Sequence, residues 1–124
     1  MAMERLNAGK MIINYDNVNY FTYEEDVDRI VTFFHYKPKI KTEKLKIIRE
    51  FRTLKDAQDT LNKKGFYLID NTFINIKNVA ISYEGAMNIE TKKIQVQIFF
   101  NNGELLEFHI LRDRWNAFKN QRLI

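Results

Sequence analysis

The sequence predicts an α+β protein built on a curved, mainly antiparallel sheet or a partly open β-barrel, with two short helices. Apolar and polar residues alternate with the period of two that marks half-buried strands, most clearly over residues 94–100. Two motifs also recur: residues 13–18 return as 74–79, and residues 51–56 return as 108–113. The first opens a strand-rich run and the second leads into a helix. We therefore expect a β-meander followed by a helix, repeated in tandem.

The composition fits one small folded domain. A chain of 124 residues, of which 45% are hydrophobic, is long enough for one core and too short for two independent ones. No apolar run approaches the roughly 20 residues that span a bilayer, and the lack of Cys excludes disulfides and thiol catalysis. We expect a flexible N-terminus over residues 1–10 and a single globular domain over residues 11–124, cytoplasmic and without a membrane partner.

Codon bias affects how the net positive charge can be interpreted. The chain has 15 Ile, 13 Asn and 13 Lys, residue types with AT-rich codons, so we expect an AT-rich genome, plasmid or phage as its source. This bias raises the lysine count for reasons unrelated to ligands. The net charge of +4 therefore permits a polyanionic partner without requiring one.

Local signals place the elements of the first half. We expect strands at 11–15, 18–23 and 27–36, turns at 16–17 and at the acidic residues 24–26, and a break at Pro38. Residues 44–52 fit a strand or part of a helix, and the repeat favours the strand. Thr53 and Asp56 then form an N-terminal capping pattern and Gly65 a stop, which predicts a helix near 54–64.

The second half is mostly extended. We expect strands at 66–69, 73–83, 94–100 and 104–110, turns at 70–71 and 102–103, a change of phase near 77–78, and a loop at 85–93. A helix over 111–121 packs Leu111, Trp115 and Phe118 on one face. The expected core is Val31, Phe33, Phe51, Leu54, Leu61, Val79, Ile81, Ile94, Val96, Ile98, Phe108, Leu111, Trp115 and Phe118.

The inventory of reactive groups is thin. Ser82 lies within an expected strand rather than at a sharp turn that exposes a nucleophile. His35 and His109 have no acidic motif beside them, and a pair of strand histidines is a weak metal signal. The acidic run 24–28 lacks the spacing and glycine of a calcium loop. We expect no catalytic residue, no cofactor and no metal site.

One basic and aromatic segment suggests a ligand. The candidate nucleic-acid-binding residues are Tyr36, Lys37, Lys39, Lys41, Lys44, Lys46 and Arg49. Alternate lysines on an extended backbone share a face about 6.6 Å apart, roughly the phosphate repeat of a single strand. Tyr20, Tyr23 and Tyr36 are candidates for stacking on bases. The alternative is a solvated edge strand whose lysines deter aggregation. The segment favours a non-enzymatic regulator that binds single-stranded or structured RNA.

The chain as a whole resembles the small PrgU-type regulators of enterococcal conjugative plasmids in size, composition and order of elements. That resemblance implies a PUA-like fold and a regulator acting on RNA, and it assigns no functional position. The C-terminal meander closed by a Trp-bearing helix, over residues 94–118, is also similar to bacterial PH-like domains, which mostly bind proteins or lipids.

A protein-interaction module is the alternative function. Such a module, PH-like or dimeric, would use exposed apolar residues such as Tyr20, Phe21 and Tyr23, or an unpaired edge strand. A continuous positive stripe beside aromatic residues favours nucleic acid, whereas a neutral apolar patch favours a protein partner.

The RNA hypothesis has a direct test. If residues 37–49 contact phosphates, replacing Lys37, Lys39 and Lys41 together with Gln should flatten the salt dependence of single-stranded RNA binding by about 0.7 per lost contact. Tyr36→Ala should weaken binding without changing that slope, because stacking releases no counterions. Filter-binding titrations at several salt concentrations measure both. An unchanged slope in the triple variant, or no RNA binding by the parent chain at low salt, removes the hypothesis.

Overall fold

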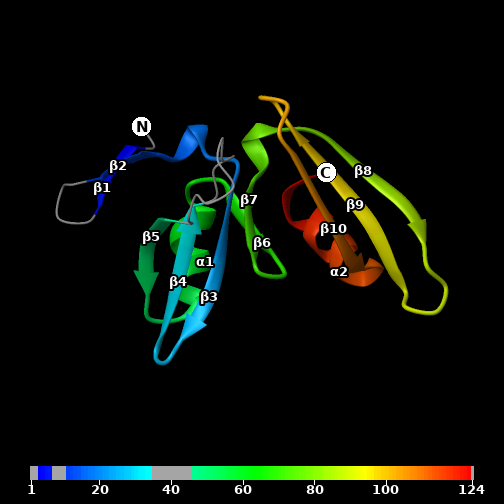
Figure 1. Ribbon diagram of the computed structural model, residues 1–124, viewed down its shortest axis with the longest axis horizontal. Helices are drawn as coiled ribbons and strands as arrows, with labels where there is room; N and C mark the ends of the chain where they lie inside the picture. Colours follow the sequence, from blue (N-terminus) through cyan, green and yellow to red (C-terminus); the bar gives the residue numbers. More distant parts are fainter. Residues whose placement is uncertain (1–2, 7–10, 35–45, 124) are drawn as a thin grey trace. The chain divides into compact units, whose positions relative to one another are not determined.

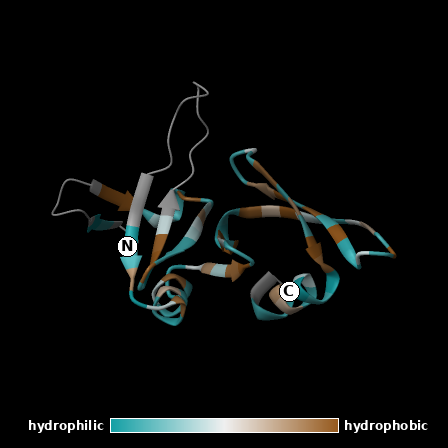
Figure 2. Ribbon diagram, turned by 60° about the horizontal axis from the view of Figure 1, so that its bottom comes forward, coloured by the Kyte–Doolittle hydropathy of each residue, from teal (hydrophilic) through white to brown (hydrophobic). Residues whose placement is uncertain are grey.

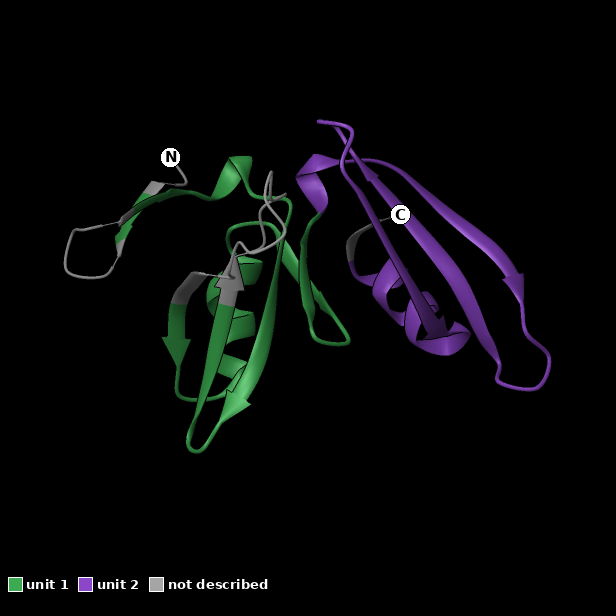
Figure 3. Cartoon of the chain, in the orientation of Figure 1, with its two compact units in different colours: residues 1–75 green, residues 76–124 purple. Residues whose placement is uncertain are grey.

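The computed structural model describes residues 3–6, 11–34 and 46–123. It divides the chain into two compact units, Met1–Asn75 and Ile76–Ile124 (Figure 3). That the two units form one domain over residues 11–124 stays a prediction. Among the described residues, no helix is long and apolar enough to cross a membrane.

The described residues of the first unit form two sheets and one α-helix (Figure 1). In chain order its elements are β1 (Met3–Leu6), β2 (Met11–Asn14), the 3-10 helix η1 (Tyr15–Asn17), β3 (Tyr20–Asp26), β4 (Arg29–Phe34), β5 (Lys46–Phe51), α1 (Leu54–Asn62), β6 (Phe66–Ile69) and β7 (Thr72–Asn75). β1 and β2 form a two-stranded sheet, and the others form a five-stranded sheet in the order β5-β4-β3-β7-β6. All neighbouring strands are antiparallel.

The second unit is a three-stranded meander with a helix on one face (Figure 1). Its elements are the 3-10 helix η2 (Ile76–Asn78), β8 (Val79–Met87), β9 (Lys93–Phe100), β10 (Leu105–Leu111), α2 (Arg112–Phe118) and the π-helical turn η3 (Lys119–Leu123). The antiparallel order is β10-β9-β8. The structure is thus α+β and mostly antiparallel, as predicted. Instead of one curved sheet, the described strands form three, and they form no closed barrel.

Sequence signals explain the main boundaries. The Thr53 hydroxyl accepts a hydrogen bond from the Asp56 backbone N–H at 3.1 Å, which satisfies a free amide at the start of α1. Gly65 ends that helix with φ of +95°, and Gly103 turns the β9–β10 hairpin with φ of +89°. The change of phase near 77–78 is η2, which turns the chain from β7 into β8.

Each unit has its own apolar interior. In the first, Tyr15, Phe21, Phe66 and Phe73 are almost completely buried together with the α1 residues Ala57 and Leu61. In the second, alternate β9 residues face α2 and are buried, as predicted: Ile94, Val96, Ile98 and Phe100. Trp115 is fully buried and stacks on Phe118 with ring centroids 5.6 Å apart. Figure 2 shows apolar segments along the strands of both units.

The acidic turn expected at 24–26 is wrong. β3 continues to Asp26, which lies opposite Arg29, so the hairpin turns at residues 27–28. The Arg29 guanidinium binds one of these acids, Asp26, at 3.2 Å, and also binds Glu50 of β5 at 2.8 Å. Strand pairing has outweighed the local preference of these residues. Likewise, the loop expected at 85–93 is shorter, since β8 extends to Met87.

Two expected core residues are exposed. Ile81 is 61% exposed because a bulge between Val79 and Ile81 shifts the register, and such a shift moves a side chain to the other face of a sheet. Leu111 is 41% exposed because it ends β10, next to the inward-facing Ile110, before α2 begins. Val79, Leu54 and Phe108 are half-buried. The side chain of Phe33 lies outside the described part of the structure.

The element order repeats more completely than the sequence predicts. A hairpin, a 3-10 helix, a three-stranded meander and a helix occur in that order twice: first β1 to α1, then β6 to α2. The two hairpins also have the same number of strand pairs, although four residues separate β1 from β2 and two separate β6 from β7. Asn14 lies opposite Met3 in β1–β2, and Asn75 lies opposite Phe66 in β6–β7, each with three further pairs toward the turn. The tandem repeat therefore includes a hairpin before each meander.

Trp115 should be among the costliest residues to truncate. Trp115→Ala removes a fully buried ring and should lower the free energy of unfolding by about 3–5 kcal/mol. Urea denaturation measures this change. Asn116→Ala, at an exposed position of the same helix, is the matched control and should cost about 0.5 kcal/mol or less. Equal losses for the two variants would contradict the placement of Trp115.

Candidate interaction site

The predicted RNA-binding segment lies mostly outside the described residues. This applies to Tyr36, Lys37, Lys39, Lys41 and Lys44. Lys46 opens β5, and Arg49 lies on the same strand. His35, the expected companion of His109, also lies outside the described residues.

Arg49 is held within the protein. Its guanidinium lies 2.8 and 3.1 Å from the two carboxylate oxygens of Glu4, and 5.0 Å from the ring centroid of Phe51. The Tyr15 hydroxyl donates to the same carboxylate at 2.7 Å. Burial, and next the Glu4 carboxylate, raise the pKa of Tyr15 above its ordinary value, so this phenol stays protonated. The cluster ties β1 to β5 and η1, and a phosphate contact by Arg49 stays a prediction.

The apolar surface expected around Phe21 is not present. Phe21 is 1% exposed and packs against Phe66, with ring centroids 5.0 Å apart. Tyr23 is half-buried, and its ring lies 5.9 Å from that of Phe73. Any exposed apolar surface must therefore come from other residues.

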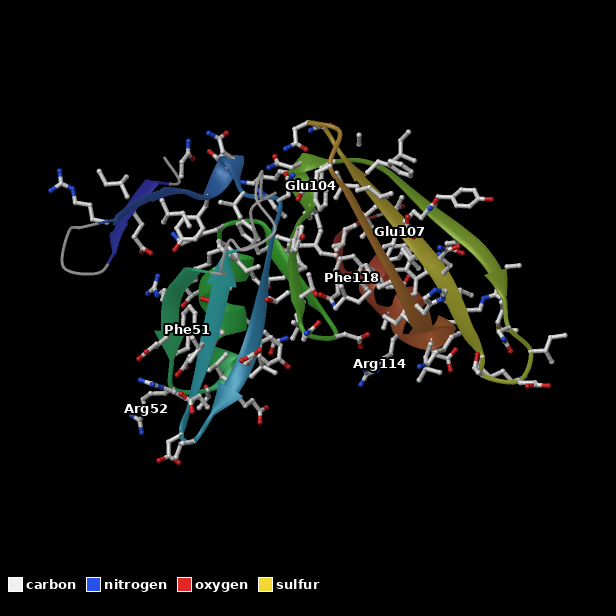
Figure 4. All side chains as sticks on the ribbon, in the orientation of Figure 1. Phe51, Arg52, Glu104, Glu107, Arg114 and Phe118 are labelled. Carbon is white, nitrogen blue, oxygen red and sulfur yellow. The ribbon has the colours of Figure 1, made fainter. Side chains whose placement is uncertain are left out.

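The outer face of the second sheet carries such residues. Because α2 covers the face that contains Val96 and Ile98, the intervening positions point away from the helix. At one end of this outer face Ile81 is 61% exposed, Tyr83 59% and Leu105 40%. Farther along the face, the Gln95 and Gln97 amides donate to the Glu107 carboxylate at 3.1 and 3.3 Å. The exposed apolar residues thus gather at one end of the face rather than covering all of it, and two of the three lie on β8. Figure 4 labels Glu107 and the buried Phe118 of this unit.

β8 forms one edge of this sheet. Among the described residues it pairs only with β9, whereas its equivalent in the first repeat, β3, pairs with β4 on one side and β7 on the other. Tyr23 N–H donates to the Asn71 carbonyl at 3.0 Å, and Asn75 N–H donates to the Asn19 carbonyl at 2.8 Å. Alternate residues of an antiparallel strand face the same neighbour, so Phe21 also faces β7.

The repeat identifies the equivalent positions in β8. Ser82 follows η2 as Phe21 follows η1, four residues after the last residue of each 3-10 helix. By this equivalence the backbone N–H and C=O of Ser82, and those of Glu84 two residues later, face the free edge. A second polypeptide strand would find unpaired donors and acceptors there.

Glu84 fixes β8 against the helix. One of its carboxylate oxygens accepts hydrogen bonds from the Trp115 indole N–H at 2.5 Å and from the Lys119 ammonium. The Lys119 hydrogen bond is the main cause that holds the pKa of Glu84 below its ordinary value, against a smaller opposing effect of burial. The free edge is therefore attached to a rigid core.

His109 lies beside a shallow hollow at the β8–β9 turn. The hollow has a volume of about 450 Å³ and is lined by Ala86, Asn88, Thr91, Lys93, Gln95 and His109. This lining places an imidazole near an ammonium and amides, without a carboxylate or a hydroxyl nucleophile in the arrangement of a catalytic triad. Ser82 lies on β8, as predicted, opposite Ile98. We assign no reaction to these residues.

Sequence reasoning missed both the β8 edge and the β1–β2 hairpin as functional features. The difference appears in the strand pairing, because among the described residues β3 has a neighbour on each side and β8 has one only. Comparison with protein-family models, curated proteins and solved structures finds no match to this chain. The resemblance to PrgU-type regulators and to PH-like domains stays a prediction.

The Glu84 ion pair should make stability depend on pH. A depressed carboxylate pKa stabilises the fold above the unfolded-state pKa, about 4.3 for Glu, and this contribution is lost as the pH falls through the folded-state value. Glu84→Gln should therefore lower stability above about pH 5 by about 1 kcal/mol or less, and its difference from the parent should shrink below about pH 4.

Urea denaturation across this pH range measures the effect. Glu90→Gln, in the exposed β8–β9 turn, is the matched control and should behave as the parent does. A deficit in Glu84→Gln that persists unchanged in acid would show that the ion pair is not its cause.

Proposed function

We propose that this protein is a non-catalytic interaction module that binds an extended polypeptide segment along the free edge of β8. The observation that carries the proposal is the difference between the two repeats: β7 covers the edge of β3, and the described residues leave the equivalent edge of β8 open. Strand addition at a sheet edge is a general mode of peptide recognition, in which backbone hydrogen bonds supply much of the affinity.

The composition of β8 supports this use. Sheet edges that stay unpaired are commonly protected by lysine, proline or other charged residues. β8 contains no Lys or Pro, and its one charged residue, Glu84, is bound by Trp115 of α2 and Lys119 of η3. By contrast, the edge strand β5 carries charges at Lys46, Arg49 and Glu50. The exposed side chains of Ile81 and Tyr83 add apolar area that an incoming strand would cover.

The other edge of the second sheet does not share this argument. β10 is an edge strand, but its equivalent in the first repeat, β5, is also an edge strand. No covering strand is therefore missing at β10. The comparison of repeats singles out β8.

RNA binding through residues 36–49 is the second candidate function. Its support is the alternating register of lysines beside Tyr36. In the described part of that segment, Arg49 is bound to Glu4, so the geometry adds support only to the polypeptide-binding proposal.

An array of immobilised ten-residue peptides tests the proposal. We expect the chain to retain uncharged peptides rich in β-branched and aromatic residues. Ser82→Pro should reduce retention by about tenfold or more, since it removes an N–H that an incoming strand would bond.

His109→Pro is the matched control. Phe100 N–H bonds the Glu104 carbonyl, and Arg112 N–H bonds the Lys92 carbonyl, so even-numbered residues of β10 face β9 and His109 faces solvent. This proline should leave retention unchanged. If the array retains no peptide, or if both prolines act equally, β8 is not the binding edge.

A further inference from the structure

Comparison of the two repeats identifies both the free edge of β8, the acceptor, and a hairpin that could pair with it, β1–β2, the donor. We infer that the strand that binds β8 is β2 of a second copy of this chain, so that copies associate head to tail. This inference rests on the proposed function and names its partner. Each chain would offer one donor hairpin near its start and one acceptor edge near its end.

The donor hairpin is equivalent to one that already performs this role. β6–β7 adds to β3 through pairs that place Ile74 opposite Tyr20, and Phe73 opposite Phe21. β1–β2 also has four strand pairs, and it leads into η1 as β6–β7 leads into η2. Within the described residues, β2 pairs only with β1. The hairpin of the first repeat is thus folded, and it lacks the neighbouring strand that the second has.

Side-chain exposure also indicates that β2 has a free edge. Ile12 and Phe73 occupy equivalent positions, two residues before the end of β2 and β7. Phe73 is completely buried, whereas Ile12 is 57% exposed. Ile13, the neighbour of Ile12, is 6% exposed, as is expected for a hairpin already packed on its own unit. Ile12 thus remains exposed, whereas its equivalent, Phe73, is buried opposite Phe21 of β3.

The repeat also predicts the register of the contact. Transferring the β3–β7 pairs places Ile13 opposite Ile81 of the second copy, and Ile12 opposite Ser82. Residues 71, 73 and 75 of the second repeat face β3 through their backbone groups. The equivalent Ile12 therefore directs its N–H and C=O away from β1 and toward the acceptor.

A contact of this kind uses two different surfaces of the chain. Such heterologous contacts produce closed rings if the rotation between copies closes and open filaments if it does not. The donor and acceptor are separate, so each can be removed without the other. This property makes the inference testable by complementation.

The experiment compares four full-length proteins by sedimentation velocity over a range of concentrations. The parent chain should associate as its concentration rises. Ile12→Pro removes the donor N–H and Ser82→Pro removes the acceptor N–H, and each should lower the association constant by about tenfold or more. His109→Pro, on the opposite edge, should associate as the parent does.

Complementation is the decisive step. A mixture of Ile12→Pro, which keeps an intact β8, with Ser82→Pro, which keeps an intact β2, should form a complex of one chain of each kind. Each variant alone should remain monomeric at the same concentration. Because proline can disturb folding, the pair Ile12→Lys and Ile81→Lys repeats the test with exposed side chains and an unaltered backbone, after circular dichroism has shown that all variants are folded.

The outcomes separate this inference from the proposed function. A parent chain that stays monomeric, with a mixture that forms no complex, overturns association between copies, including the case in which β2 covers β8 of its own chain. If the peptide array nevertheless retains peptides in a Ser82-dependent manner, the interaction module stands with a different partner. Loss of both signals removes both proposals. Association that neither proline affects also overturns the inference.

Discussion

The ladder between β3 and β7 joins one repeat to the next, because β7 belongs to the second repeat and pairs with a strand of the first. Unpaired backbone groups at a sheet edge tend to find a partner, since they otherwise remain available to any passing strand. In the first repeat that partner is supplied by the hairpin that follows α1. The chain contains two meanders and two hairpins, but its described strands join only one meander to a hairpin of the other repeat.

The pairing of β3 with β7, which has no counterpart at β8 among the described strands, explains why equivalent residues of the two repeats differ in exposure. Phe21 and Phe73 lie opposite each other and are buried. At the equivalent positions, Ser82 is exposed and Ile12 is more than half exposed. Ser82 is small and polar, so it suits an edge position that is exposed to solvent whenever no strand is bound there. The hydrogen bond from the Trp115 indole to Glu84 attaches β8 to α2, although among the described residues no strand pairs with the other edge of β8.

Local signals in the sequence predicted local structure. Thr53 caps α1 and the Asn102-Gly103 pair turns the β9–β10 hairpin because both depend on residues within a few positions. The bulge before Ile81, the pairing of Arg29 with Glu50, and the division of the described strands into three sheets depend on strands distant in sequence. Periodicity carries no information on them. The basic residues 37–44 lie outside the described part of the chain, so the predicted RNA site is untested. The free edge of β8 follows from the difference in strand pairing between the two repeats, which local sequence signals do not contain.

Hydrogen exchange of individual backbone amides, followed by NMR at increasing protein concentration, tests the central claim most directly. At low concentration the Tyr23 amide, which bonds β7, should exchange slowly, while the amides of Ser82 and Glu84 should exchange quickly. As concentration rises, protection should appear at Ser82 and Glu84 together with Ile12, and it should leave His109 unchanged. Slow exchange at Ser82 and Glu84 in the most dilute sample, or exchange at these positions that does not respond to concentration, would contradict the account.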